Sequence, residues 1–420
     1  MYRVPAISKK ASVWLLLIFP IYFYFSGVHR LQFLGEDGSQ YISSIKKLLF
    51  SALSILMLVF LFTRDRLKWE SLFVLPLLLI FFEFISSVFN LNIEGGFSLM
   101  VRISFFLLGI FWIAERISLR AAFKWCASWY SHKLISLICV VLVLGYFWGT
   151  FRVDVSSGFG NSRGGFGIWL FQLTCISFFT LRAVEKNKFE YVLFLVFLPI
   201  FILQCVVASR VGMIASLLMA CYFFWVNYDW RKSAYCLLAS ALASILISKG
   251  LHLIDLNDRA IDPLRYSEAI LYVDDGLSGV ERWIEVFDRY ISYRLTIARS
   301  AFSNISFNDL LFGVGLGNFK GGIPRYPHLG LYDVHNVYLK MFGEYGVFAF
   351  FTLSAIVLNG LRHAYAFGVR RENWDLFVVQ LLYVGMSMFH PDLLLTAIGT
   401  SLVYMFSYAM ASREFGRENT

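Results

Sequence analysis

Long apolar runs separated by short polar segments repeat along the whole chain. A helix that crosses the hydrocarbon core of a bilayer needs about 20 mostly apolar residues. By this criterion the runs predict about twelve spans, some of them short or broken, at 11–28, 45–63, 71–89, 100–114, 134–149, 167–181, 190–208, 211–226, 233–248, 341–360, 374–389 and 393–411. The pattern therefore predicts an all-α, polytopic bundle of membrane helices.

The interval from Lys249 to Asn336 interrupts the pattern, because its composition is close to that of a soluble protein. Long segments between spans are usually functional or disordered. Residues 277–302 carry apolar side chains at helical spacing, so we expect amphipathic helices that lie on the membrane. The chain then divides into a first set of spans in 1–248, one large loop in 249–336 and the last spans in 337–420.

Composition excludes the other broad classes of protein. Hydrophobic residues make up 58% of the chain and charged residues 15%, against roughly 45–50% and 25% in soluble domains. A soluble fold of this size could not bury so much apolar surface, and the same values exclude a disordered or fibrous chain.

The distribution of positive charge predicts the topology. With the N-terminus in the cytoplasm, 20 Lys and Arg fall in inside segments and 7 in the short outside segments. Cytoplasmic loops are the ones enriched in Lys and Arg, so we expect both termini in the cytoplasm and the large loop outside. None of the six cysteines lies in that loop, so we expect no disulfide framework there.

The first polar patch is Ser209-Arg210, which lies between two apolar runs with almost no loop. An arginine near bilayer depth is costly and usually faces a cavity or a partner. The same arginine can instead extend its guanidinium to the outer headgroups from a tight turn. The sequence leaves both interpretations open.

The second patch holds Arg294 and, further on, the glycines of Gly313-Val-Gly315-Leu-Gly317-Asn318. The glycines do not form the nucleotide-binding pattern G-x-G-x-x-G, because position 318 is Asn and no βαβ unit surrounds them. They predict instead a turn that brings the backbone close to another group.

The third patch runs from Asp333 through His335-Asn336 to Tyr338, directly before the predicted span at 341–360, and includes Glu344-Tyr345-Gly346 inside that span. A single histidine in a membrane protein is more often a structural hydrogen-bonding group than a catalytic one. His335, however, ends the outer loop at the depth where Arg210 is expected to emerge, and this placement favours a functional role.

Taken in order, Ser209-Arg210, Arg294, Gly313-Val-Gly315 and His335-Asn336 resemble the motifs of bacterial O-antigen ligases and Wzy-type O-antigen polymerases. The resemblance covers roughly 190–350 by motif and the rest by topology. It implies a GT-C-like bundle in the bacterial inner membrane with a periplasmic active site. It also implies that a glycan linked to undecaprenyl pyrophosphate is transferred to a hydroxyl of a second lipid-linked repeat unit or of lipid A–core. A chain-length regulator is a further implied partner, and nucleic acid is not.

The resemblance assigns roles to individual residues. Arg210 and Arg294 would hold the donor pyrophosphate, because a guanidinium binds phosphate oxygens in pairs. His335 would act as the general base, since imidazole has an ordinary pKa of about 6.5. The supporting residues are Ser209, Asn336, Tyr338, Gly313 and Gly315.

We expect neither a metal nor another cofactor. The adjacent acids of the loop are Asp274 and Asp275, and the following Gly276 makes a turn the better interpretation.

Two alternatives stay open. Within the family, the Gly-Leu-Gly-Asn-Phe turn and its spacing to His335 favour a polymerase over a ligase. Outside it, a flippase or transporter would show matching broken spans in two halves of the chain. Pro20, Pro76 and Pro199 interrupt spans and Glu83 lies inside one, but the halves do not match and a transporter has no need of so large a loop.

Overall fold

The computed structural model describes the residues 71–91, 103, 167–168, 170–176, 178, 200, 204, 210–227, 231, 234–235, 238, 242, 279–290, 293–324, 330–390, 393–394 and 398–416. The spans predicted at 11–28, 45–63 and 134–149 lie outside these residues, and so do Ser209, Asp274 and Asp275. The span predicted at 100–114 is described at one position, that at 190–208 at two and that at 233–248 at four.

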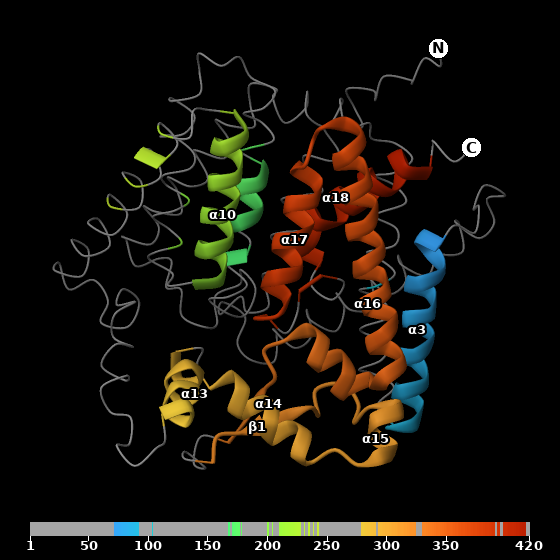
Figure 1. The fold of residues 1–420 in the computed structure, drawn as a ribbon. Helices are drawn as coiled ribbons and strands as arrows, with labels where there is room; N and C mark the ends of the chain where they lie inside the picture. The colour runs from blue at the N-terminus through green and yellow to red at the C-terminus, as the bar shows by residue number, and fades with distance from the viewer. Residues whose placement is uncertain are drawn as a thin grey trace, which may run out of the picture.

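Five long helices coincide with predicted spans: α3 (Ser71–Phe89), α10 (Arg210–Asn227), α16 (Val337–Arg371), α17 (Asp375–Ser387) and α18 (Ile398–Gly416). They run side by side, with α16 packed against α3, α17 and α18 (Figure 1). Among the described residues, α16 is long and apolar enough to cross a membrane, while Val74–Phe89, Val211–Phe223 and Asp375–Ser387 are shorter apolar helices. The helical class is confirmed in this part of the chain.

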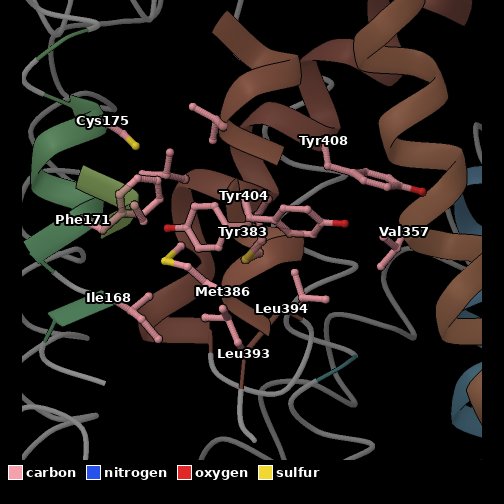
Figure 2. Close-up of a cluster of buried hydrophobic side chains, with 14 of the residues drawn as sticks. Ile168, Phe171, Cys175, Val357, Tyr383, Met386, Leu393, Leu394, Tyr404 and Tyr408 are labelled. Atoms are coloured by element: carbon pink, nitrogen blue, oxygen red, sulfur yellow. The ribbon is translucent and has the colours of Figure 1, made fainter. Parts of the chain in front are cut away.

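Aromatic side chains fill the space between α17, α18 and the helical residues near 170. Tyr383 and Tyr404 are fully buried there, and Phe171 meets the Tyr383 ring edge-on with centroids 5.3 Å apart (Figure 2). The ring of Tyr408 is buried on the other side of α18, against Gly360 of α16. On the outer faces, Phe81 of α3 and Phe351 of α16 are exposed. Large apolar side chains inside and outside a helix bundle are what a lipid environment permits, because lipid tails replace a polar surface.

The elements of the predicted loop lie across one end of these helices (Figure 1). They are α13 (Gly279–Tyr290), α14 (Arg294–Ser303), α15 (Phe307–Phe312), β1 (Lys320–Gly322) and β2 (Leu331–Asp333). We call this end of the bundle, where α3 and α17 finish and α16 begins, the site end.

The helices predicted in 277–302 are confirmed, with one break. Tyr293 adopts a left-handed conformation (φ 56°) that separates α13 from α14. Ile297, Ala298 and Ala301 of α14 are buried in a small core together with Phe319 and Val334. The prediction that this segment lies on the membrane is therefore wrong for α14, whose apolar face is used inside the loop.

The short antiparallel hairpin of β1 and β2 was not predicted. It pairs Lys320 with Asp333, Gly321 with Tyr332 and Gly322 with Leu331. Strands of three residues carry too few positions for an alternating pattern, and Gly-Gly in β1 has low strand propensity. Contact with α14, described below, explains why glycine is required there.

Candidate functional site

Arg294 is the first residue of α14 and contacts the end of α17. Its Nη1 donates a hydrogen bond of 2.8 Å to the carbonyl oxygen of Phe389, and its guanidinium lies 5.7 Å from the centroid of the Phe389 ring. Phe389 follows α17 by two residues. The contact holds the first turn of α14 at the level where α17 ends.

Asp288 fixes the start of α14. Its carboxylate accepts hydrogen bonds from the backbone N–H groups of Leu295 (2.7 Å) and Thr296 (3.1 Å) and from the Thr296 hydroxyl. A buried carboxylate at a helix start satisfies N–H groups that have no partner within the helix. The sequence places Asp288 six positions before Arg294, outside helical reach, and the structure shows that it serves the backbone of this helix.

The hairpin packs directly on α14. A side chain at Gly321 would collide with the carbonyl oxygen of Ile297, so β1 approaches the helix backbone as only glycine allows. The N–H of Gly322 donates a hydrogen bond of 3.1 Å to the Ser300 hydroxyl. Lys320 and Asp333 form a half-exposed pair at 3.9 Å, which adds little stability.

His335 lies between β2 and α16 and is half-buried. The next residue, Asn336, is the N-cap of α16: its side-chain oxygen accepts hydrogen bonds of 3.0 Å from the N–H groups of Tyr338 and Leu339. His335 is therefore held between a paired strand and a capped helix. We call α14, the hairpin and residues 334–336 the Arg294–His335 scaffold, because they place both residues in one folded unit.

Tyr338 lies in the first turn of α16, and its side chain approaches Ser387, the last residue of α17. The Ser387 hydroxyl donates to the carbonyl oxygen of Val384. Tyr338 thus joins the start of α16 to the end of α17, where Phe389 meets Arg294.

The glycine turn packs against α16, and the prediction of a close backbone approach is confirmed. Gly313 and Gly315 have φ of 76° and 87°, and a side chain at Gly313 would collide with the backbone of Glu344. The N–H groups of Val314 and Gly315 donate to the carbonyl oxygens of Gly343 (2.8 Å) and Glu344 (3.0 Å).

Those carbonyl oxygens accept bonds from the turn because α16 is broken at Gly346, which has φ 85° and ψ 179°. A side chain at Gly346 would collide with the carbonyl oxygen of Leu311. The two glycine-dependent segments therefore fit each other, and Gly313 and Gly315 support the fold of the site end.

Glu344, which the sequence places in the third patch without a role, and the end of α3, which was not predicted to take part, complete this junction. The Glu344 carboxylate accepts a 2.8 Å hydrogen bond from the N–H of Gly317. Ser86 of α3 donates to the carbonyl oxygen of Glu344 (3.1 Å), and Asn90, the residue after α3, donates to that of Gly313 (3.1 Å). A polar residue directly after an apolar span was the available sequence signal for Asn90.

Arg210 is the first residue of α10, as predicted. Near the other end of this helix the Tyr222 hydroxyl donates a 2.9 Å hydrogen bond to Asp375, the first residue of α17. The two helices lie side by side (Figure 1), so α10 begins at the level where α17 ends. Arg210 therefore opens its helix at the site end.

A buried amide holds the first turns of α10. The side-chain nitrogen of Gln204 donates to the Ser216 hydroxyl (2.6 Å) and to the carbonyl oxygen of Gly212 (3.2 Å). A side chain at Gly212 would collide with the backbone of Gly167. These contacts fix the position of the helix that carries Arg210.

The site end thus gathers a histidine, an arginine and the start of a second arginine-bearing helix. Arg294, His335, Asn336 and Tyr338 belong to one connected set of elements, and Arg210 opens a helix at the same level. Among the described residues no group of three or more His, Cys, Asp or Glu side chains could hold a metal ion. The arginine side chains of the site end can bind an anion, and the imidazole of His335 can transfer a proton.

These features define a class: a helical membrane protein with a basic, histidine-containing site at one end of its helices. The model of the O-antigen ligase family matches residues 194–354. The match encloses every residue of the resemblance, from Ser209-Arg210 to His335-Asn336 and Tyr338, so this part of the chain is similar to that family. The similarity supports an enzyme of glycosyl transfer in O-antigen biosynthesis. No curated protein matches the chain.

Proposed function

We propose that the chain transfers a glycan from a lipid pyrophosphate to an acceptor hydroxyl at the periplasmic face of the bacterial inner membrane. The observation that carries the proposal is the Arg294–His335 scaffold. It places a guanidinium and an imidazole at the end of the bundle where the Arg210 helix also starts. In a family of O-antigen ligases, a guanidinium and an imidazole at the same end of the bundle suit a reaction with an anionic leaving group and a proton to remove.

In the proposed reaction, the acceptor oxygen forms a bond to the anomeric carbon of the donor sugar. The bond between that carbon and the phosphate oxygen breaks, and undecaprenyl pyrophosphate leaves with the electron pair. Arg210 and Arg294 stabilise the negative charge on the leaving pyrophosphate, because guanidinium groups bind phosphate oxygens in two-pronged geometry. His335 accepts the proton of the acceptor hydroxyl.

Within the family, we propose polymerisation of repeat units as the first candidate and ligation to lipid A–core as the second. Ligation is kept because the matching family model is described as O-antigen ligase. The glycine turn packs against α16. This packing explains the glycines of the turn equally well in a polymerase and in a ligase. The lipopolysaccharide of a deletion strain distinguishes the two: core with one repeat unit indicates a polymerase, and core alone indicates a ligase.

The two arginines make a metal unnecessary for charge stabilisation, so we propose a metal-independent enzyme. Transfer by the purified chain in lipid should persist in EDTA. An enzyme inactivated by EDTA and restored by Mg²⁺ or Mn²⁺ alone would contradict this part of the proposal.

The proposal requires the loop to face the periplasm. A cysteine introduced at position 275 should react with a membrane-impermeant reagent from the periplasmic side, and one at position 366 should not. The opposite pattern would place the reaction in the cytoplasm.

A further inference from the structure

We propose that α13 is an interfacial anchor whose apolar face binds the outer leaflet of the bilayer and thereby sets the position of Arg294. Four apolar side chains recur along α13 at positions i, i+3, i+4 and i+7, the spacing that puts them on one face of a helix. We call this surface the α13 apolar face; it is formed by Val280, Trp283, Ile284 and Phe287.

The α13 apolar face points away from the rest of the described protein. Its side chains are 52–76% exposed, with Trp283 the most exposed of the four. The opposite side of the helix carries Glu281, Arg282 and Glu285. A helix with one charged and one apolar face, without the length of a span, is typical of a segment lying in the plane of the interface.

Contacts place α13 at the right depth for such binding. The following helix, α14, is bonded to Phe389, two residues beyond the end of α17. Elsewhere in the loop, Phe312 stacks on Phe89, the last residue of α3, with ring centroids 4.2 Å apart. The loop therefore rests directly on the ends of the apolar helices, where their lipid-facing surface meets the headgroups.

The side-chain chemistry favours lipid as the occupant. The bundle also exposes apolar surface on its side away from α13, including Phe81, Phe84 and Val88 of α3, and this surface faces the same lipid phase (Figure 1). Tryptophan is enriched at the membrane–water boundary, because its ring is apolar and its N–H is polar. The α13 apolar face, with its central Trp283, has the composition suited to the headgroup layer of the same leaflet.

Asp288 connects the anchor to the site. It is the first residue after the α13 apolar face and is 2% exposed. Its carboxylate holds the N–H groups of Leu295 and Thr296, directly after Arg294. A shift of α13 normal to the membrane would therefore move the first turn of α14. This coupling rests on the proposed function, in which Arg294 binds the pyrophosphate of a lipid anchored in the same leaflet.

Photo-crosslinking tests the anchor without relying on activity. A benzophenone amino acid replaces Trp283 or Phe287 in the full chain, reconstituted in bilayers of phosphatidylethanolamine and phosphatidylglycerol. The same residue at Glu281 or Glu285 is the matched control. We expect several-fold more phospholipid adduct from positions 283 and 287. Equal adducts from both faces, or adducts at 283 and 287 mainly with a polypeptide, would overturn the proposal.

A second experiment tests the coupling. Ile284→Asp places a charge on the α13 apolar face, and Arg282→Asp introduces the same side chain on the polar face as a control. We expect Ile284→Asp to raise the KM for the lipid-linked donor several-fold with little change in kcat, and Arg282→Asp to leave both nearly unchanged. Lipid adducts at 283 and 287 with an unchanged KM in Ile284→Asp would overturn the coupling. Absence of transfer in the unmodified chain would instead refute the proposed function.

Discussion

Two helices begin with an arginine at the site end, and they are held in different ways. The α14 helix, with Arg294, is positioned by the loop: Asp288 caps it and the hairpin packs on it through Gly321. The α10 helix, with Arg210, is positioned by the bundle through the buried Gln204 amide. One arginine therefore depends on contacts within the loop, and the other on contacts between apolar helices.

The two arginines can therefore be disturbed by different kinds of substitution. Bundle contacts are buried among apolar side chains, so changing them risks the whole fold. The loop is a small unit whose own contacts can be altered one at a time. If both arginines bind one pyrophosphate, changes to the loop contacts and changes to the bundle contacts should both lower glycan transfer. The first should alter the structure of the loop, and the second that of the bundle.

The largest effect is expected for His335→Ala, which tests whether the loop unit that positions Arg294 also carries the general base. Loss of a general base typically lowers the rate by about 10²–10⁴-fold, so we expect transfer to fall by this factor. Membrane insertion and thermal stability should stay close to those of the unmodified protein. Near-normal transfer by the purified variant would remove His335 from the mechanism.

The next largest effect is expected for the arginines. Lysine keeps the charge and loses the two-pronged geometry, so Arg210→Lys or Arg294→Lys should each lower kcat/KM by roughly 10–100-fold, the value of one or two charged hydrogen bonds. If both bind the same pyrophosphate, the double variant should be little worse than the worse single one. Multiplying losses, or full activity in either single variant, would show two independent sites.

A smaller effect is expected from the glycines of β1, which belong to the loop. Gly321→Ala would force a side chain against the Ile297 carbonyl, so we expect the α14 unit to lose about 1–3 kcal/mol, as overpacking does, and transfer to fall. Gly322→Ala is the matched control, because its added carbon would meet Leu331 at an ordinary 3.5 Å. Limited proteolysis and activity measure both. Equal behaviour of the two variants would mean that the contact with α14 is unimportant.

The smallest effect is expected for the cap. Asp288→Ala removes the acceptor for the first N–H groups of α14, which should cost about 0.5–2 kcal/mol of local stability and lower activity by up to about tenfold. Hydrogen exchange of residues 295–297 should rise while that of α10 stays constant. Glu285→Ala, one turn earlier on α13, serves as the control. An unchanged exchange rate in Asp288→Ala would contradict the capping role.

The helical runs and the glycine turn could be predicted from sequence, because each depends on local properties. The length of the apolar runs predicted the first and last residues of α3, α10 and α17 to within a few positions. Closely spaced glycines predicted a close backbone approach, and Gly313 makes one against Glu344.

The rest depends on tertiary contacts. The break at Tyr293 has no Gly or Pro to mark it, and the bond from Arg294 to Phe389 joins positions 95 residues apart. The hairpin is stabilised by the contact of Gly321 with the backbone of α14. The residues next to Gly321 in the sequence do not indicate that α14 is its partner. Local patterns gave the parts of the candidate site, and packing gave their arrangement.

The break at Gly346 bears on how the protein is made. A carbonyl group left without a donor in lipid is costly, so a span normally completes its own hydrogen bonds before it leaves the translocon. The carbonyl groups of Gly343 and Glu344 take their donors from Val314 and Gly315 instead. Those donors precede α16 in the sequence, so the ribosome makes them before the carbonyl groups that they satisfy. The first turns of α16 are thus completed by an earlier part of the chain.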